Sequence, residues 1–218
     1  LLQYRAHTNT IKRLDPLPSK KSSLNLYLAL FKIWGSLQGD KMKGLVLLFP
    51  GIRYTVDMPL LYYSGLYYRQ QGYKVVPVSY GAQFDQVEFH NQDITQEIED
   101  AKTYCLPQLQ AIDYSKYDSV IFVSKSLGTV VAGWAQQTLH ILCKQIYLTP
   151  IKQTLPYMDS SCMAIAGDTD QVLDPAVLKA YCKKHDIEYH VFPGGHRIEV
   201  KKDISRNLKT IDAIVALL

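Results

Sequence analysis

The chain has 218 residues, of which 47% are hydrophobic and 20% charged, as in a soluble globular protein long enough for one domain with a substantial core. Its net charge of +4 is uneven. Residues 1–43 hold eight Lys or Arg against two Asp or Glu, a net of +6, and residues 44–218 hold sixteen against eighteen, a net of −2. No nucleic-acid-binding motif accompanies the basic segment, so we expect no nucleic-acid partner. No apolar run is long enough to span a bilayer and Leu1–Arg5 is not a signal peptide, so we expect no membrane association.

The four cysteines are far apart in the sequence, at Cys105, Cys143, Cys162 and Cys182. They form no Cys-x-x-Cys pair, and no histidine lies at metal-ligand spacing from them. We therefore expect reduced, mostly buried thiols in a cytoplasmic protein, with a disulfide pair as the weaker alternative. The sequence predicts no metal site and no cofactor.

From residue 44 onward, short apolar runs alternate with amphipathic segments. Strands are expected at 44–49, 73–80, 119–123, 145–148, 162–166 and 188–192. Helices are expected from about 57 to Gly72, at 85–110, 127–142 and 175–185, and from Ile204 to Leu218. This alternation predicts a mostly parallel sheet with right-handed crossovers.

The segment before residue 44 is less regular. Residues 24–34 fit a long strand or an apolar helix, and their partial alternation favours an edge strand. We interpret 1–218 as a single domain, in which 44–218 is the core and 1–43 a basic N-terminal extension.

One turn in the chain suggests chemistry. The apolar run at 119–123 leads directly into Ser124-Lys125-Ser126-Leu127-Gly128 and then into a helix. A strand that enters a small-x-Ser-x-Gly turn raises one hydroxyl at the carboxyl edge of a sheet, where a base can reach it. Ser126 is therefore the candidate nucleophile.

A serine hydroxyl needs a base, and the base works best when a carboxylate orients it. Both groups follow later strands: Asp168 and Asp170 come after 162–166, and His196 comes after 188–192. The carboxyl ends of parallel strands meet at one edge, so these side chains are expected to converge on Ser126.

Four features together resemble the small lidless members of the α/β-hydrolase superfamily, over residues 44 to 218. They are Phe49-Pro50-Gly51-Ile52, the Ser126 turn, Gly167-x-x-Asp170 and Gly195-His196, in the chain order Ser, Asp, His. The resemblance implies a mostly parallel central sheet with helices on both faces. Too few residues separate 146 from 162 to hold a lid domain.

The resemblance also implies roles for these residues. Asp170 is the first choice for the acid and Asp168 the second, while His196 is the general base. The backbone N–H groups of Leu127 and Ile52, with Arg53 as an alternative to Ile52, would form the oxyanion hole.

The chain departs from the family pattern at two places: Ser124 replaces the first elbow glycine, and Pro50-Gly51 replaces the usual His-Gly. Arg53 and Tyr54 are possible contacts for a substrate carboxylate or phosphate. Lys125 is expected to be a solvated side chain, with a contact to an anionic substrate as the alternative.

These observations predict a carboxylesterase-like serine hydrolase that forms an acyl-enzyme with small acyl esters or thioesters. Its expected partner is a small-molecule acyl substrate. The alternative is a catalytically inactive binding or scaffold protein of the same fold, in which His196 would point away from Ser126 or Asp170 would cap a helix instead of meeting the imidazole. The acyl chain, the leaving group and the oligomeric state are not specified by the sequence.

Overall fold

The computed structural model describes residues 42–81, 84 and 93–218. Lys41–Leu218 form one compact unit of the chain, distinct from Leu1–Asp40. The strand expected at 24–34 and the first part of the helix expected at 85–110 lie outside the described residues.

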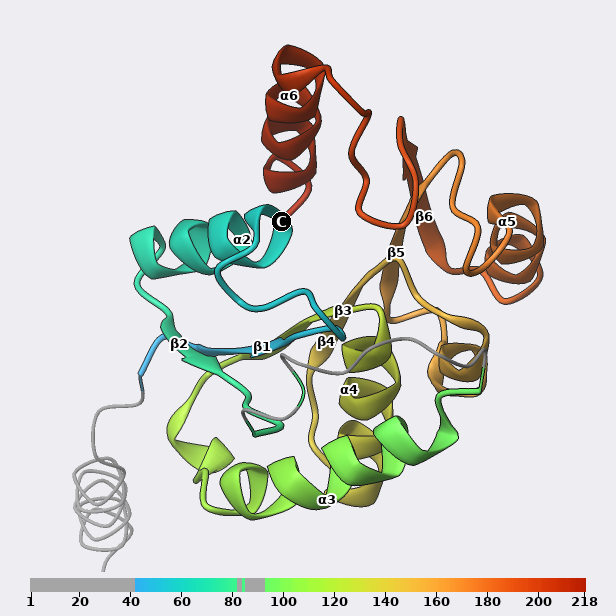
Figure 1. Cartoon of the computed structure of the whole chain (residues 1–218). Coiled ribbons are helices and arrows are strands. Elements are labelled where there is room, and N and C mark those ends of the chain that lie inside the picture. Colours follow the sequence, from blue (N-terminus) through green and yellow to red (C-terminus); the bar gives the residue numbers. More distant parts are fainter. Residues whose placement is uncertain (1–41, 82–83, 85–92) are drawn as a thin grey trace, which may run out of the picture. The chain divides into compact units, whose positions relative to one another are not determined.

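The unit is built on a six-stranded sheet in the order β2-β1-β3-β4-β5-β6, with every neighbouring pair parallel (Figure 1). The strands are β1 (Leu45–Phe49), β2 (Lys74–Pro77), β3 (Val120–Lys125), β4 (Lys144–Leu148), β5 (Met163–Gly167) and β6 (Glu188–Phe192). Every residue of β1, β3 and β5 is buried, as expected for strands covered on both faces. The predicted parallel sheet is confirmed.

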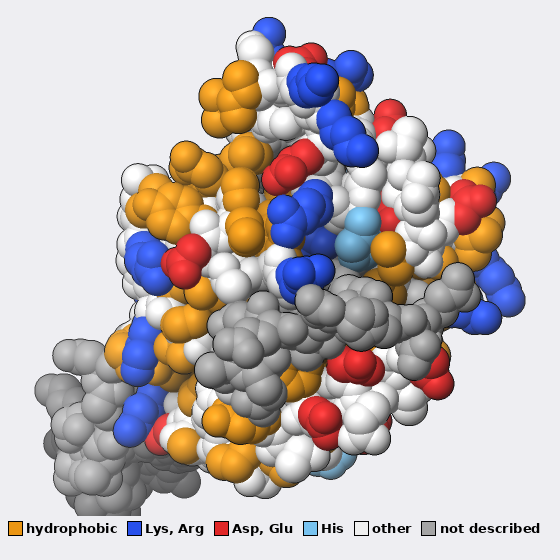
Figure 2. Space-filling model, viewed as in Figure 1, with side chains coloured by type: hydrophobic (Ala, Val, Ile, Leu, Met, Phe, Trp, Pro, Cys, Tyr) orange, Lys and Arg blue, Asp and Glu red, His pale blue; other side chains and the backbone are white. Residues whose placement is uncertain are grey.

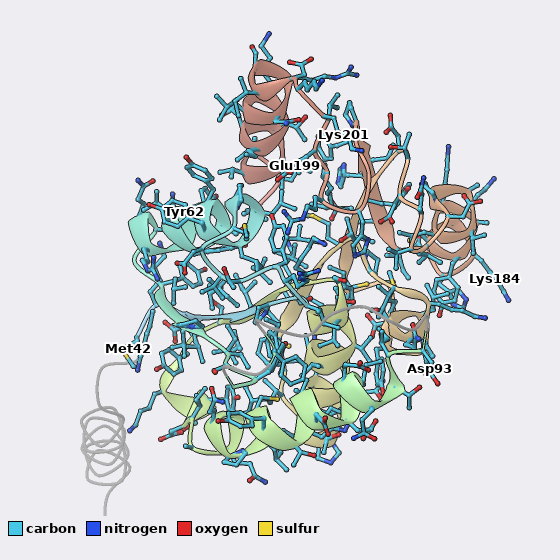
Figure 3. All side chains as sticks on the ribbon, viewed as in Figure 1. Met42, Tyr62, Asp93, Lys184, Glu199 and Lys201 are labelled. Carbon is cyan, nitrogen blue, oxygen red and sulfur yellow. The ribbon has the colours of Figure 1, made fainter. Side chains whose placement is uncertain are left out.

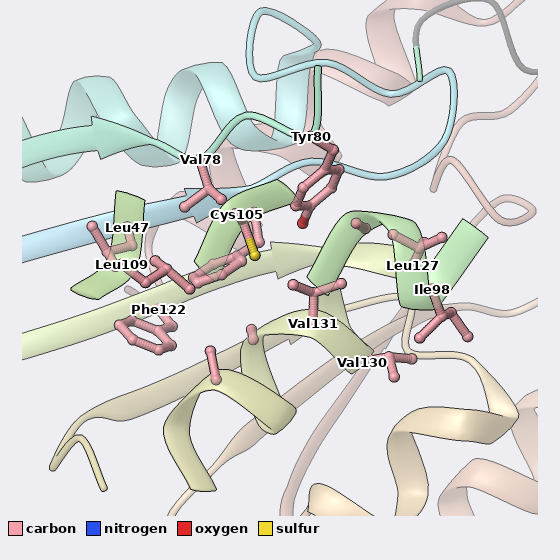
Figure 4. Packing of buried hydrophobic residues seen from close by; sticks show 14 of the residues in the cluster. Leu47, Val78, Tyr80, Ile98, Cys105, Leu109, Phe122, Leu127, Val130 and Val131 are labelled. Atoms are coloured by element: carbon pink, nitrogen blue, oxygen red, sulfur yellow. The ribbon is translucent and has the colours of Figure 1, made fainter. Parts of the chain in front are cut away.

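Alternate residues of each strand point to opposite faces of the sheet. Because both sets are largely apolar in the central strands, helices cover both faces. The helices are α2 (Pro59–Gln70), α3 (Thr95–Gln110), α4 (Leu127–Thr138), α5 (Pro175–Lys184) and α6 (Ile204–Val215), with short 3-10 turns η2 (Tyr114–Lys116) and η3 (Lys152–Tyr157). Val46 and Leu48 pack in the cluster under α2 and α6. Leu47 and Phe122 pack with Leu109 of α3 and Val131 of α4 on the other face (Figure 4).

Several element boundaries differ from those expected. The helix expected at 85–110 begins at Thr95, whose backbone N–H donates to the Asp93 carboxylate at 3.0 Å. The helix expected at 127–142 ends at Thr138, and His140 then turns the chain with a φ of 52° toward β4. β2 stops at Pro77, near the end of its partner β1, which stops at Phe49.

Only η3 and its flanking turns lie between β4 and β5, so no lid domain is inserted there, as the sequence predicts. All four cysteines are free, and three of them are buried. Across the described ranges, no helix is both long enough and apolar enough to cross a membrane.

Candidate active site

Ser126 lies at the junction of β3 and α4 in a strained backbone conformation, with φ 54° and ψ −121°. Such a conformation costs about 1–3 kcal/mol and persists only where the surroundings impose it. Here the Ser126 N–H donates to Leu148 O at 3.1 Å. The Ser126 carbonyl accepts the Thr129 N–H at 2.9 Å and the Thr129 hydroxyl at 2.6 Å. Both sides of the turn are therefore held by hydrogen bonds, and the hydroxyl of Ser126 is presented at the sheet edge.

The residues two places before and after Ser126 allow the turn to form. A Cβ on Gly128 would overlap the carbonyl oxygens of Phe49 and Pro50, so the start of α4 approaches the end of β1 as closely as only glycine permits. Ser124, which replaces the usual glycine, is fully buried, and its hydroxyl donates to Ile146 O at 3.3 Å. A small residue that satisfies its own polar group is thus compatible with the turn.

Three predicted side chains meet at this edge in one hydrogen-bonded chain. His196 Nε2 lies 2.8 Å from Ser126 Oγ, and His196 Nδ1 lies 2.9 Å and 3.1 Å from the two carboxylate oxygens of Asp170. Because an ionised carboxylate can only accept, we assign the ring proton to Nδ1, which leaves Nε2 free to accept the Ser126 proton. The Asp170 side chain is only 1% exposed, so water does not compete for this contact.

Asp168, the second choice for the acid, does something different. Its carboxylate accepts the Gly194 N–H at 2.8 Å, and its own N–H donates to Phe192 O at 2.8 Å. Asp168 therefore fixes the end of β6 and the loop that carries His196. Asp170 instead accepts the Val172 N–H at 2.8 Å, which orients its carboxylate beside the imidazole.

The predicted oxyanion donors lie on either side of Ser126. Gly51 and Tyr54 close a tight turn after β1 with two backbone hydrogen bonds of 3.0 Å and 3.2 Å, and Ile52 lies inside this turn. A Cβ placed on Gly51 would lie 3.0 Å from Ser126 Cβ, so the turn packs directly against the nucleophile. Among the described residues, no hydrogen bond engages the N–H of Ile52 or of Leu127. Both donors are therefore available to a ligand.

Lys125 differs most from expectation, because it is 1% exposed rather than solvated. Its ammonium lies over the ring of Tyr54, 4.9 Å from the centroid, and the Arg197 guanidinium lies over the same ring at 5.5 Å. Burial lowers the pKa of Lys125 to about 7, while the negative charge of Asp170 acts in the opposite direction. The residue that precedes the nucleophile therefore encloses its amine within the protein, against the ring of Tyr54.

The two candidate substrate contacts are placed differently. Tyr54 is 2% exposed and its hydroxyl accepts the Leu60 N–H at 3.0 Å, so a direct substrate contact by Tyr54 is not supported. Arg53 is exposed at the rim, and its carbonyl accepts a 2.8 Å hydrogen bond from Arg197. Each of three residues adjoins a different part of the site. Tyr54 closes the oxyanion turn, Lys125 precedes Ser126, and Arg197 follows His196. We call these three residues the Tyr54 cluster.

The electrostatics favour a neutral His196. Burial lowers the pKa of His196 below its ordinary value, and the positive charges of Lys125 and Arg197 lower it further. The hydrogen bond that His196 Nδ1–H donates to the Asp170 carboxylate acts in the opposite direction and raises this pKa. At neutral pH the imidazole is therefore able to take a proton. In the part of the chain that the structure describes, no three His, Cys, Asp or Glu side chains gather as metal ligands.

Comparison with known proteins identifies the fold family to which this architecture corresponds. No protein-family model matches the chain, and no curated protein matches it by sequence. Many solved structures match the chain in fold, among them three with TM-scores of 0.56 to 0.58. They are an α/β serine hydrolase homologue from Coxiella burnetii (17% identity, 83% of this chain and 87% of that one, TM-score 0.56), an α/β serine hydrolase without a lid from Xanthomonas campestris (13%, 80% and 80%, 0.56) and Est1E from Butyrivibrio proteoclasticus (11%, 82% and 88%, 0.58). The chain therefore has the α/β-hydrolase fold, in a form without a lid.

Proposed function

We propose that the protein is a serine hydrolase that cleaves small acyl esters or thioesters through an acyl-enzyme. The observation that carries this proposal is the continuous hydrogen-bonded chain from Ser126 through His196 to Asp170. Under the inactive alternative, His196 points away from Ser126 or Asp170 caps a helix. The 2.8 Å contact of His196 with Ser126 and the 2.9 Å contact of His196 with Asp170 favour the enzyme instead.

In this proposal Ser126 Oγ attacks the acyl carbon while His196 Nε2 takes its proton. The negative charge that develops on the carbonyl oxygen is stabilised by the N–H groups of Ile52 and Leu127, the second of which lies at the N-terminus of α4. The imidazolium then gives its proton to the departing alcohol or thiol. Water enters, loses a proton to His196 and releases the carboxylic acid from Ser126.

The substrate class rests on the open, lidless edge and on one relative. Est1E is also known with ferulic acid, a carboxylic acid, bound to it. An edge without a lid suits small or polymer-attached acyl groups that approach from solvent.

The test compares Ser126→Ala with Ser124→Ala, which removes a hydroxyl from the same turn. We expect Ser126→Ala to lower kcat for 4-nitrophenyl acetate about a thousandfold or more and to abolish labelling by a fluorophosphonate. Ser124→Ala should retain both within a few-fold, because its hydroxyl contacts only Ile146 O. Hydrolysis by Ser126→Ala at the wild-type rate would refute the proposal.

A further inference from the structure

An open cavity of about 890 Å³ borders the candidate site. Its walls come from the turn after β5, the loop after β6 and the start of α6. His196 forms part of the wall, so the cavity begins at the imidazole that would exchange protons with the reaction. Val172 and Pro193 add apolar surface to the same walls.

The cavity is lined with an excess of positive charge. Its cations are Arg197, Lys201, Lys202 and Arg206, and its anions are Asp168 and Glu199. Four positive against two negative groups give +2, whereas residues 44–218 as a whole carry −2. Figure 2 shows Lys and Arg side chains gathered on this face, and Figure 3 shows Lys201 and Glu199 on the segment that leads to α6.

Of the two acidic side chains, Asp168 already has a hydrogen-bond partner within the protein. One carboxylate oxygen of Asp168 is occupied by the Gly194 N–H at 2.8 Å. All four cations are exposed. Arg197 already donates to the Arg53 carbonyl, so the side chains of Lys201, Lys202 and Arg206 are the more available to a ligand. A cavity whose walls carry an excess of one sign of charge concentrates ligands of the opposite sign.

The position of His196 indicates which part of a substrate enters the cavity. After attack by Ser126, the imidazolium must protonate the leaving oxygen or sulfur atom, so that atom passes within hydrogen-bond reach of His196. The remainder of the leaving group then extends along the wall to which His196 belongs.

We propose that the cavity binds an anionic leaving group, an alcohol or thiol that carries a carboxylate, sulfonate or phosphate. This inference rests on the proposed function and specifies the substrate class of the same site. Lys201 and Lys202 are the principal contacts for the negative charge, and Arg197 holds the rim beside His196.

Two aryl acetates test this directly, since their leaving phenols have similar size and differ in charge: 4-acetoxybenzenesulfonate and 4-acetoxybenzenesulfonamide. We expect the wild-type protein to favour the sulfonate by about tenfold in kcat/KM at low ionic strength, and the preference to fall as salt is added. A second pair places the charge on the acyl side: mono-4-nitrophenyl glutarate and 4-nitrophenyl pentanoate. Here we expect less than about a twofold difference, because an exposed charge outside the lined cavity is screened by water.

The decisive variant is Lys201→Glu/Lys202→Glu, which should bring the sulfonate preference to about one or invert it. Lys183→Glu/Lys184→Glu is the matched control, because it changes the net charge equally on α5, where neither residue lines the cavity. Figure 3 shows Lys184 on that helix, at the far right of the view. The control should keep the wild-type preference.

The outcomes separate the two proposals. If both acetates are hydrolysed with equal kcat/KM, or if both double variants change the preference alike, the anionic leaving group is refuted while the serine hydrolase stands. If the glutarate ester is preferred over the pentanoate ester as strongly as the sulfonate is over the sulfonamide, the anionic leaving group is likewise refuted. If no fluorophosphonate labels Ser126, the proposed function fails, and this inference fails with it.

Discussion

The turn that holds Ser126 and the loop that holds His196 are stabilised in different ways. Ser126 is fixed by main-chain hydrogen bonds to Leu148 and Thr129 within a buried junction of strand and helix. The loop after β6 is partly exposed and, besides the buried Ile198, is held by polar side chains. Asp168 binds the Gly194 N–H, and Asn207 both accepts from and donates to the Val200 backbone, at 2.8 Å and 3.1 Å.

This difference indicates which substitutions will unfold the protein and which will only impair a site. A side chain added at the elbow must displace backbone, as the crowding at Gly128 shows. A polar side chain removed from the His196 loop leaves the sheet intact and changes only geometry or charge. The loop is therefore the region in which activity can be altered without loss of the fold.

The largest effect is expected from Asp170→Asn, in the turn after β5 whose carboxylate orients His196 of the loop after β6. The amide no longer stabilises the imidazolium or fixes the ring proton on Nδ1, so we expect kcat to fall about a thousandfold or more. Asp168→Asn is the matched control, because its remaining carbonyl oxygen still accepts the Gly194 N–H. It should lower kcat less than about tenfold. Equal losses in steady-state ester hydrolysis would contradict the different roles of the two carboxylates.

A smaller effect is expected where the two regions meet, at Tyr54. Tyr54→Leu removes the ring over which Lys125 and Arg197 lie, and we expect kcat to fall about tenfold with little change in KM. Tyr54→Phe keeps the ring and loses only the acceptor for the Leu60 N–H. It should retain most of the activity while lowering the melting temperature. If Tyr54→Phe lowers kcat as much as Tyr54→Leu does, then the hydroxyl group, and not the ring face, supports activity.

The smallest effect is expected from Lys125→Met, and it concerns pH. Removal of this buried charge raises the pKa of His196, so the acid limb of the kcat/KM profile should move to higher pH. Lys144→Met, at an exposed lysine, should leave that limb in place. An acid limb that does not move, or moves to lower pH, would contradict the charge effect.

The same variant should alter how stability depends on pH. The pKa of Lys125 is about 7 in the folded protein and 10.5 for an ordinary lysine, so the unfolded chain binds more protons between these values. The free energy of unfolding therefore rises with pH across this window, and the stability contributed by neutral Lys125 is lost as pH falls to about 7. Denaturant titrations at pH 7 and 8.5 should show this rise in the wild type and a smaller rise in Lys125→Met.

Much of the fold and the candidate site was accessible from the sequence because local patterns determine both. The apolar runs before Ser126, Asp170 and His196 are short and continuous, and parallel strands bring their carboxyl ends to one edge. The sharp turn at Ser126 is likewise indicated by Ser124 and Gly128, the small residues two places before and after it.

Other features depend on contacts between distant segments and left no local signal. The burial of Lys125 requires Tyr54 and Arg197 to converge over it, and nothing near Lys125 in the sequence indicates this. The charged cavity depends on the path of the loop between β6 and α6, which has no apolar periodicity. Helix limits were missed where a single residue such as His140 adopts a positive φ.

The hydrogen bond from Arg197 to the Arg53 carbonyl has a consequence for turnover. It joins the residue after the base to the turn that holds Ile52, and the Tyr54 cluster reinforces that connection. A substitution that displaces the loop after β6 would therefore also disturb the turn that holds one oxyanion donor. Proton transfer by His196 and stabilisation of the oxyanion would then weaken together, in acylation and in deacylation alike.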